Sequence, residues 1–356
     1  MEDLYREIKM VDTDIVLFLK YAFHSSGMNP ISNELTKLGI DHVVASKRHI
    51  IYDKFNETGK RWKYFIIADE WADLFRNCSE NLITISHSMA NKNTTFNNRN
   101  NEMDYMFIPS HYYKNELLMR GVRPRKKMVV TGYVPADKIF NKKMNTDSWW
   151  HQNKERHFGN TVNILIAPTY NRDLSLVDEL IRVEHRWEMI RRIVECEHTN
   201  YRIAFKPHPV LPKKYPDQMS ALREFEMTYG PDKFYIHEDS HSNIADAILW
   251  SDVVIGDCSG AILLAVAGHK PTLLFSNAFR ERSEYYDPTG PEWTFRKRIG
   301  RNLTTFDNLL EDINYTLYKD YVFSERIQLA NLIYGEHQGN AAANCAKYIQ
   351  KLYEGG

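Results

Sequence analysis

Residues 251–268, SDVVIGDCSGAILLAVAG, decide the fold class of this chain. The apolar run at 253–255 predicts a buried strand, the small residues after it predict a tight turn, and the next apolar run predicts a helix. A strand leading through a small-residue turn into a helix is typical of a doubly wound parallel sheet. Free N–H groups and the positive dipole end at Ser259 and Gly260 favour a bound phosphate. The alternative is a turn that only allows close packing of helix on sheet.

The same alternation of short apolar runs and amphipathic segments extends along the whole chain and predicts parallel sheets. Strands are expected at 14–19, 42–46, 64–68, 82–86, 105–108 and 128–132, and then at 162–167, 202–206, 234–236, 253–256 and 272–275. Pro30 and Gly39 predict the start and end of a short crossover helix after the first strand. Further helices are expected at about 175–197, 216–229 and 242–251, with a helical pattern from about 305 to 354.

The chain of 356 residues is long enough for two domains. The polar stretch 141–160 lacks periodicity and separates the two series of strands and helices. We therefore predict a Rossmann-like domain at 1–150, a second one at 161–325, and a final helix at 326–356 that packs back toward the first domain. The fold class is α/β, with two doubly wound parallel sheets facing a central cleft.

Composition and charge exclude several classes of protein. The 46 Lys and Arg residues balance the 46 Asp and Glu residues, which argues against a nucleic-acid partner. The four cysteines are far apart, which indicates neither a disulfide framework nor a zinc site and suits a reducing cytoplasm. We expect neither a secretory leader nor a membrane-spanning helix. Two basic runs, at 120–127 and 296–301, are expected on the surface, and contact with anionic lipid is the alternative to simple solvation.

Ligands of open α/β sheets bind beyond the carboxyl ends of the strands, so polar residues that follow strands are the candidates for a site. In the first half these are His24 and Ser25 after the first strand, and His87 with Lys92 after the fourth. A histidine accepts a proton at neutral pH, so His87 is a candidate general base. A hydrogen-bonded structural histidine is the alternative.

In the second half, Thr169 and Arg172 follow a buried strand and offer donors to a phosphate or ribose, although a helix N-cap explains such residues equally well. Lys206 and His208 lie in a turn stiffened by two prolines, which indicates anion contact. The chain has no GxGxxG fingerprint and no Walker sequence, which argues against NAD and against ATP in a P-loop. It also lacks HExxH and GxSxG, so metalloprotease and hydrolase chemistry are not favoured.

Taken in order, these motifs resemble those of the CDP-glycerol glycerophosphotransferase family, transferases of teichoic-acid and capsule synthesis with the GT-B fold. The resemblance spans roughly residues 80 to 345. The matching segments are Ser86-His87-Ser88 with Lys92, Ala167-Pro168-Thr169, Lys206-Pro207-His208-Pro209, Ser251-Asp252, Asp257-Cys258-Ser259-Gly260 and Lys270-Pro271.

The resemblance implies transfer of glycerol phosphate or ribitol phosphate from a CDP-activated donor to a hydroxyl of a lipid-linked glycan or polyol-phosphate acceptor. It implies catalytic roles for His87 and His208 and an acceptor-side position for His24, Ser25 and Lys92 in the N-terminal domain. The implied donor-binding and phosphate-binding residues are Thr169, Arg172, Lys206, Asp257, Ser259 and Gly260. No metal and no other cofactor is expected, since Lys206, His208 and a helix start would stabilise the diphosphate. The expected location is the cytoplasm, with peripheral contact to the inner face of the membrane left open.

Two alternatives remain. The turn Asp257-Cys258-Ser259-Gly260 is similar to the Asp-Ser-Gly turn of the nucleotide-sugar 2-epimerases, and Gly339-Asn340-Ala341-Ala342 resembles a helix start of that family. Its Ala-Gly-Leu-Arg and Glu-Arg-Pro-Glu elements are absent, so a UDP-N-acetylglucosamine 2-epimerase-like activity comes second. A non-catalytic nucleotide-binding protein comes third, because one fold can carry many functions.

Overall fold

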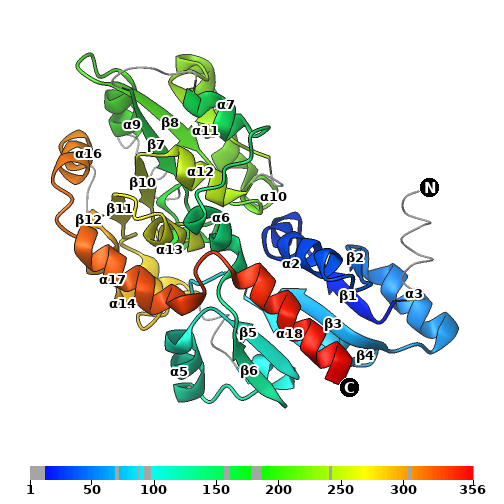
Figure 1. The fold of residues 1–356 in the computed structure, drawn as a ribbon. Helices are drawn as coiled ribbons and strands as arrows, with labels where there is room; N and C mark the ends of the chain where they lie inside the picture. The colour runs from blue at the N-terminus through cyan, green and yellow to red at the C-terminus, as the bar shows by residue number, and fades with distance from the viewer. Residues whose placement is uncertain are drawn as a thin grey trace. The chain divides into compact units, whose positions relative to one another are not determined.

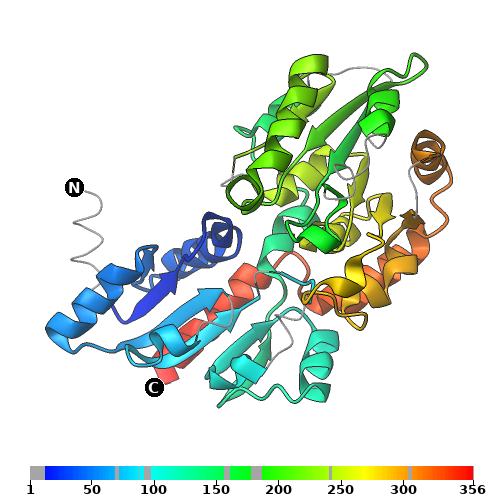
Figure 2. The same cartoon turned by 180° about the vertical axis from the view of Figure 1, so that it is seen from behind.

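A computed structural model describes residues 13–68, 72–86, 88–91, 98–155, 161–177, 187–239, 243–303 and 307–355. The chain forms two compact units (Figures 1 and 2). Unit 1 comprises Met1–Met89, Thr94–Asp137 and Asn331–Gly356, and unit 2 comprises Ala90–Asn93 and Lys138–Ala330. Each unit is built on one parallel sheet with helices, so the predicted α/β class with two Rossmann-like sheets is confirmed.

The sheet of unit 1 has six described strands in the order β2-β1-β3-β4-β5-β6. All neighbouring strands are parallel. Their apolar runs are buried, as expected for a parallel sheet covered on both faces. Every strand that the sequence predicts in the first half is present. The strands are β1 (Ile15–Phe18), β2 (Val43–Ala45), β3 (Trp62–Ala68), β4 (Ser79–Ile85), β5 (Tyr105–Ile108) and β6 (Lys127–Val130).

The helices of unit 1 include the last helix of the chain, α18 (Ala341–Gly355), which shares a hydrophobic core with α2 (Ser25–Lys37) and the sheet (Figure 1). The carboxylate of Asp137 holds the start of α18, because it accepts the main-chain N–H groups of Ala341 and Ala342 at 2.9 Å. The predicted return of the C-terminal helix to the first domain is therefore confirmed. The other described helices are η1 (Ala22–His24), α3 (Arg48–Thr58), α4 (Ala72–Phe75), η2 (Asn98–Glu102), α5 (His111–Met119), η3 (Val134–Ala136) and η6 (Gly335–His337).

The crossover after β1 differs from the prediction at its start. The helix begins at Ser25 rather than at Pro30, so Pro30 lies inside α2, where it removes one main-chain hydrogen bond. The helix packs close to the sheet at Gly27, where a Cβ would be 3.1 Å from Ile85 Cδ1. The predicted end is confirmed, since Gly39 follows α2 with a φ of +69°.

The sheet of unit 2 has the described order β12-β11-β10-β7-β8-β9, again with parallel neighbours. The sequence predicts five of these strands and misses β12, which has three residues of which only Leu303 is buried. So short and polar a segment carries no strand pattern. The strands are β7 (Thr161–Ile166), β8 (Asn200–Phe205), β9 (Phe234–Ile236), β10 (Val253–Gly256), β11 (Thr272–Phe275) and β12 (Arg301–Leu303).

The helices of unit 2 confirm the predictions at 216–229 and 242–251, whereas much of the predicted helix at 175–197 lies outside the described residues. The helical pattern from about 305 divides into α16, α17 and α18. The described helices are α6 (Asp137–Phe140), α7 (Trp149–Glu155), η4 (Arg172–Leu174), α9 (Trp187–Val194), α10 (Leu211–Lys214), α11 (Pro216–Tyr229), α12 (Ile244–Trp250), α13 (Gly260–Ala267), η5 (Arg280–Arg282), α14 (Pro291–Thr294), α15 (Arg296–Ile299), α16 (Leu309–Tyr318) and α17 (Phe323–Tyr334).

The polar stretch predicted as a linker contains α7, which packs on unit 2. The Trp149 ring stacks on Tyr235 with centroids 4.1 Å apart, and the buried Arg202 donates to Asn153. These contacts explain why unit 2 begins at Lys138, before the boundary at 150 that the sequence predicts. Two adjacent tryptophans were the available signal, since large aromatic side chains are mostly buried.

Candidate functional site

The strand order of unit 2 reverses between β7 and β10. The chain moves from β7 to β8 and β9 on one side of the sheet, and then returns to place β10 on the other side of β7. Ligands of open α/β sheets bind outside the carboxyl ends of the strands at such a switch point. The loops after β7 and β10 carry Thr169 and Asp257, so two of the predicted segments meet there.

The carboxylate of Asp257 ties these two loops together. It is fully buried and accepts the main-chain N–H of Thr169 at 2.9 Å and that of Leu176 at 3.0 Å. It also accepts the N–H groups of Cys258 at 2.7 Å and Ser259 at 3.0 Å. The negative charge is thus satisfied within the protein, and Asp257 shapes the turn from below.

The start of α13 keeps free hydrogen-bonding capacity. The Ser259 hydroxyl donates to the carbonyl oxygen of Ala167 at 2.8 Å, which fastens the turn to the end of β7. Within the described part of the chain, no group accepts a hydrogen bond from the N–H groups of Gly260 and Ala261. Two unpaired donors at the positive end of a helix suit an anion. A Cβ on Gly256 would lie 2.6 Å from Ile262 Cγ2, so this glycine allows the close approach of α13.

Arg296 lies beneath the same turn. Its buried guanidinium donates to the carbonyl oxygen of Asp257 and to Asn302 Oδ1, both at 2.8 Å, and also to the carbonyl oxygen of Phe275. Burial lowers the pKa of Arg296 to about 10, so the group stays charged at neutral pH. The prediction of a surface run at 296–301 is therefore wrong for Arg296. Its spacing of three from Ile299, which puts both on the buried face of α15, was the signal in the sequence.

Lys206 and His208 follow β8. The Lys206 ammonium is buried and donates to the carbonyl oxygen of Asp239 at 3.2 Å, and this burial lowers its pKa to about 8. His208 Nδ1 accepts the Val210 N–H at 3.3 Å, which leaves the proton of the neutral ring on Nε2. The His208 ring lies 4.6 Å from the Tyr170 ring. Both predicted side chains therefore offer hydrogen-bond donors.

The other two donor-side candidates differ from each other. The Thr169 side chain is buried, and its hydroxyl donates to Asn171 Oδ1 at 3.2 Å, so it stabilises its own loop. Arg172 begins η4, and its side chain lies outside the described structure. Asn277 lies in the loop after β11. Its amide donates to the Ser175 carbonyl at 3.3 Å, which links this loop to the loop after β7. Asn277 was not predicted as a site residue, because no motif surrounds it in the sequence.

Of the residues predicted for the acceptor side, His24 is buried, and its ring packs edge-on against Tyr21 and Phe23, at 5.4 and 4.8 Å. Ser25 is half-buried at the first position of α2. His24 and Ser25 follow β1, as the sequence indicates, and lie in the helical segments η1 and α2. His87 and Lys92 lie outside the described residues.

The basic run at 120–127 lies on the surface of unit 1. Arg125 pairs with Glu102 at 2.5 Å, and Lys126 donates to Asn81 at 2.5 Å. In the residues that the structure describes, no three or more His, Cys, Asp or Glu side chains cluster as a metal site would require. None of the helices described is both long and apolar enough to cross a bilayer.

Comparison with known protein families identifies the class of enzyme to which the chain belongs. The model of the CDP-Glycerol:Poly(glycerophosphate) glycerophosphotransferase family matches residues 81–351. The chain belongs to this family. The predicted family and enzyme class, a glycerophosphotransferase, are therefore confirmed. The comparison with curated proteins finds no match.

Solved structures with the same fold include the wall teichoic acid polymerase TagF. It is 12% identical, with a TM-score of 0.69 over 96% of this chain and 90% of that chain. A TagF variant soaked with CDPG is 13% identical, with a TM-score of 0.67 over 96% and 89%. A putative UDP-N-acetylglucosamine 2-epimerase from Listeria monocytogenes is 17% identical, with a TM-score of 0.63 over 96% and 97%. The predicted GT-B fold is confirmed, and it is shared with the runner-up enzyme class.

Proposed function

We propose that the chain transfers glycerol phosphate from CDP-glycerol to a hydroxyl group of a growing cell-surface polymer. The turn between β10 and α13 carries this proposal. Two unpaired N–H groups lie at the start of α13, and the buried guanidinium of Arg296 lies beneath them. A helix start of this kind favours the diphosphate of a nucleotide-activated donor. Family membership indicates the donor, and the related TagF structure was soaked with CDPG.

In the proposed step, the acceptor oxygen attacks the β-phosphorus of CDP-glycerol. The bond from that phosphorus to the bridging oxygen breaks, and CMP leaves with the electron pair. His87 takes the proton of the acceptor hydroxyl as general base. Lys206 and His208 donate to the phosphate oxygens and stabilise their charge, because such transfers depend mainly on positioning and electrostatic stabilisation.

We propose that this charge stabilisation needs no divalent ion. The Lys206 ammonium supplies a positive charge, and the Nε2–H of His208 and the start of α13 supply hydrogen-bond donors and a favourable dipole where a metal would otherwise act. Turnover measured after treatment with EDTA tests this point. Activity that falls and returns on addition of Mg²⁺ or Mn²⁺ would contradict it.

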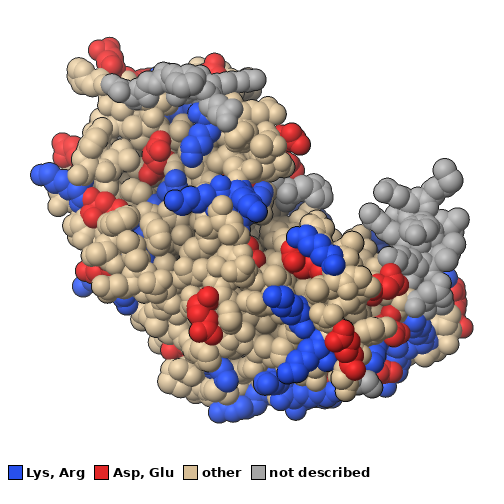
Figure 3. Space-filling model, viewed as in Figure 1, with Lys and Arg blue, Asp and Glu red and all other residues tan. Residues whose placement is uncertain are grey.

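We further propose that the enzyme works in the cytoplasm on a lipid-linked acceptor, with unit 1 touching the inner face of the membrane. Figure 3 shows lysine and arginine gathering over the region of α18 and β6. There Lys63, Lys126 and Lys127 lie 5.1 to 6.0 Å from the rings of Tyr353, Tyr105 and Tyr348. Lysines near an anionic surface contribute about 1 kcal/mol each. Salt-sensitive co-sedimentation with anionic vesicles, absent with neutral vesicles, is the expected result.

The test of the mechanism is CMP release from CDP-glycerol in the presence of a short glycerol-phosphate oligomer. His87→Ala is expected to lower kcat by about 10²-fold or more, since it removes the general base. The dissociation constant of CDP-glycerol should stay the same. His208→Ala should lower kcat and weaken donor binding together, because it removes a phosphate contact. The exposed His198 provides the matched control, and full activity of His87→Ala would remove that residue from the mechanism.

A further inference from the structure

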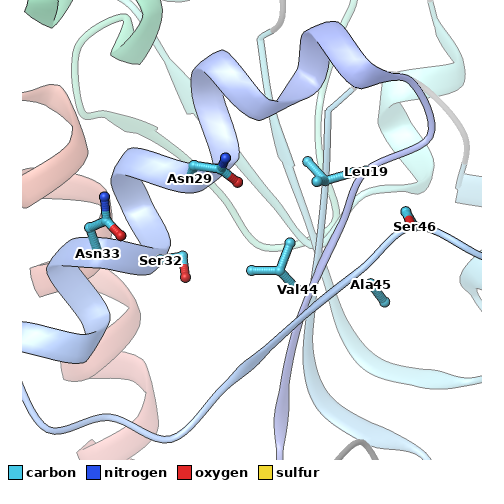
Figure 4. A pocket seen from close by; sticks show the side chains of 7 residues that line it. All are labelled: Leu19, Asn29, Ser32, Asn33, Val44, Ala45 and Ser46. Atoms are coloured by element: carbon cyan, nitrogen blue, oxygen red, sulfur yellow. The ribbon is translucent and has the colours of Figure 1, made fainter. Parts of the chain in front are cut away.

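A polar pocket of about 400 Å³ lies in unit 1, beside the carboxyl ends of β1 and β2 (Figure 4). Helix α2 contributes Asn29, Ser32 and Asn33 to its wall, and the strand ends contribute Leu19, Val44 and Ser46. Its volume is at the small end of the roughly 300–1,000 Å³ range of ligand pockets. The pocket therefore suits one small chemical unit.

Helix α2 has a polar face that lines the pocket and an apolar face that packs in the core. Asn29, Ser32 and Asn33 are spaced i, i+3 and i+4, which places them on one face of the helix. Met28, Ile31 and Leu35 are fully buried in the core of unit 1. The polar face of α2 is thus turned toward the pocket, as Figure 4 shows.

The hydroxyl of Ser32 has a defined orientation. His42 Nδ1 lies 2.9 Å from the carbonyl oxygen of Ile40, which only accepts, so Nδ1 carries the proton of the neutral ring. Nε2 is then an acceptor, and Ser32 Oγ donates to it at 2.6 Å. The lone pairs of Ser32 Oγ are left to accept from a ligand.

The two asparagines supply donors as well as acceptors. Their side chains are exposed, and none of the described residues forms a hydrogen bond with the amide of Asn29 or Asn33. Each carboxamide offers two N–H donors and one carbonyl acceptor. Leu19 and Val44 add an apolar surface on the strand side. None of the described residues that line the pocket is charged.

We infer that this pocket binds one neutral polyhydroxyl unit, an alditol or a sugar ring, of the acceptor. Hydroxyl groups donate and accept at once, which matches carboxamides and a serine oxygen, while the C–H edges of the unit lie against Leu19 and Val44. A phosphate would instead require cationic or helix-start donors in the lining. The assignment to the acceptor rests on the proposed function, whereas polyol binding itself does not.

Binding is tested first, by saturation-transfer NMR with ribitol and methyl N-acetylglucosaminide as neutral probes and glycerol 3-phosphate as the charged probe. The wild-type protein should give a saturation-transfer signal with at least one neutral probe, and the Asn29→Ala/Asn33→Ala variant should lose most of this signal. Alanine is a better helix former than asparagine, so α2 remains folded. Thr36→Ala is the control, because Thr36 is exposed on the same helix and outside the pocket. Equal saturation in both variants, or binding of the charged probe alone, would overturn the inference.

Kinetics then test the link to the acceptor. With a short glycerol-phosphate oligomer, the double variant should raise the acceptor KM by about tenfold or more, because two hydrogen bonds are lost. The donor KM should not change. An unchanged acceptor KM in an active enzyme would overturn the acceptor assignment. If the wild-type protein neither bound CDP-glycerol nor transferred glycerol phosphate, the proposed function would be contradicted. The NMR test of polyol binding would remain valid, because it does not depend on that function.

Discussion

The carboxylate of Asp257 accepts the main-chain N–H of Thr169 at 2.9 Å. This bond joins the loop after β7 to the loop after β10, although the two residues are far apart in the sequence. It brings two segments typical of the family into contact at the switch point of the sheet. The proposed donor-binding surface is therefore formed by both loops together, and Asp257 shapes it through hydrogen bonds to the main chain.

Asp257→Asn should destabilise unit 2 by about 3 kcal/mol, because an amide group would face buried N–H donors and leave them without acceptors. Urea unfolding measures this change, and calorimetry should show weaker CDP-glycerol binding. Asp252→Asn is the control: its exposed carboxylate accepts one main-chain N–H, from Asn163 at 2.8 Å. Normal stability combined with lost donor binding would instead mean that Asp257 contacts the donor directly.

Arg296→Gln should lower stability by roughly 3 kcal/mol and raise the donor KM, since it leaves buried carbonyl groups of the turn unpaired. Arg296→Lys keeps the charge but not the planar set of donors, so its effects should be intermediate. The neighbouring Lys297 is exposed, and Lys297→Gln should change neither quantity. If Lys297→Gln lowered stability and raised the donor KM as much as Arg296→Gln, the net charge of residues 296–301 would be responsible rather than the hydrogen bonds of Arg296.

Local periodicity was enough to predict the sheets, because strands buried on both faces appear as continuous apolar runs. It failed where packing decides the structure. Pro30 predicts the start of a helix, whereas α2 begins at Ser25 and contains Pro30. Arg296 appeared as one of several surface arginines, because hydrogen bonds to distant carbonyl groups leave no trace in a local sequence.

The site could be predicted only in part, because contacts between residues far apart in the sequence leave no local pattern. The motif at Asp257 was recognisable, but its carboxylate serves four main-chain N–H groups, two of which belong to another loop. The pocket on α2 was not predicted, because Asn29 and Asn33 look like ordinary exposed helix residues until the ends of β1 and β2 are placed beside them.

The pH dependence of donor use should report on Lys206. Its pKa of about 8 in the fold, against 10.5 ordinarily, means that the cation is lost as the pH rises through 8. The value of kcat/KM for CDP-glycerol should therefore fall above pH 8. Lys206→Arg stays protonated and should extend activity to higher pH. A wild-type profile that stays flat beyond pH 9 would exclude a role for the charge of Lys206.

The burial of Lys206 has the opposite effect on stability: activity should fall above pH 8, whereas the contribution of this residue to stability should rise. Between pH 8 and 10.5 the unfolded chain keeps the Lys206 proton and the folded protein does not, so this group adds stability as the pH rises. Protonated Lys206 therefore costs the fold free energy at neutral pH. Lys206→Met should raise the free energy of unfolding at pH 7 by about 1–3 kcal/mol while lowering kcat/KM. A variant that is both less stable and less active would indicate a structural role alone.

Gly256→Ala should shift α13 and cost about 1–3 kcal/mol, because the new Cβ would lie 2.6 Å from Ile262 Cγ2. The donor KM should rise with it, since the start of that helix moves. Adding Ile262→Ala removes the clash and should restore part of the donor affinity, although the smaller side chain leaves a cavity. Urea unfolding measures the loss of stability, and titration with CDP-glycerol measures the loss of donor affinity. If the double variant recovered no donor affinity, the clash with Ile262 would not be the reason for the glycine at 256.

The transfer reaction itself can be followed in a ³¹P NMR time course with the purified protein, CDP-glycerol and a glycerol-phosphate oligomer. CMP and a new phosphodiester should appear in equal amounts, with little CMP formed when the oligomer is left out. UDP-N-acetylglucosamine should remain unchanged. Conversion of UDP-N-acetylglucosamine without any acceptor, together with unchanged CDP-glycerol, would contradict glycerol-phosphate transfer and favour epimerase activity.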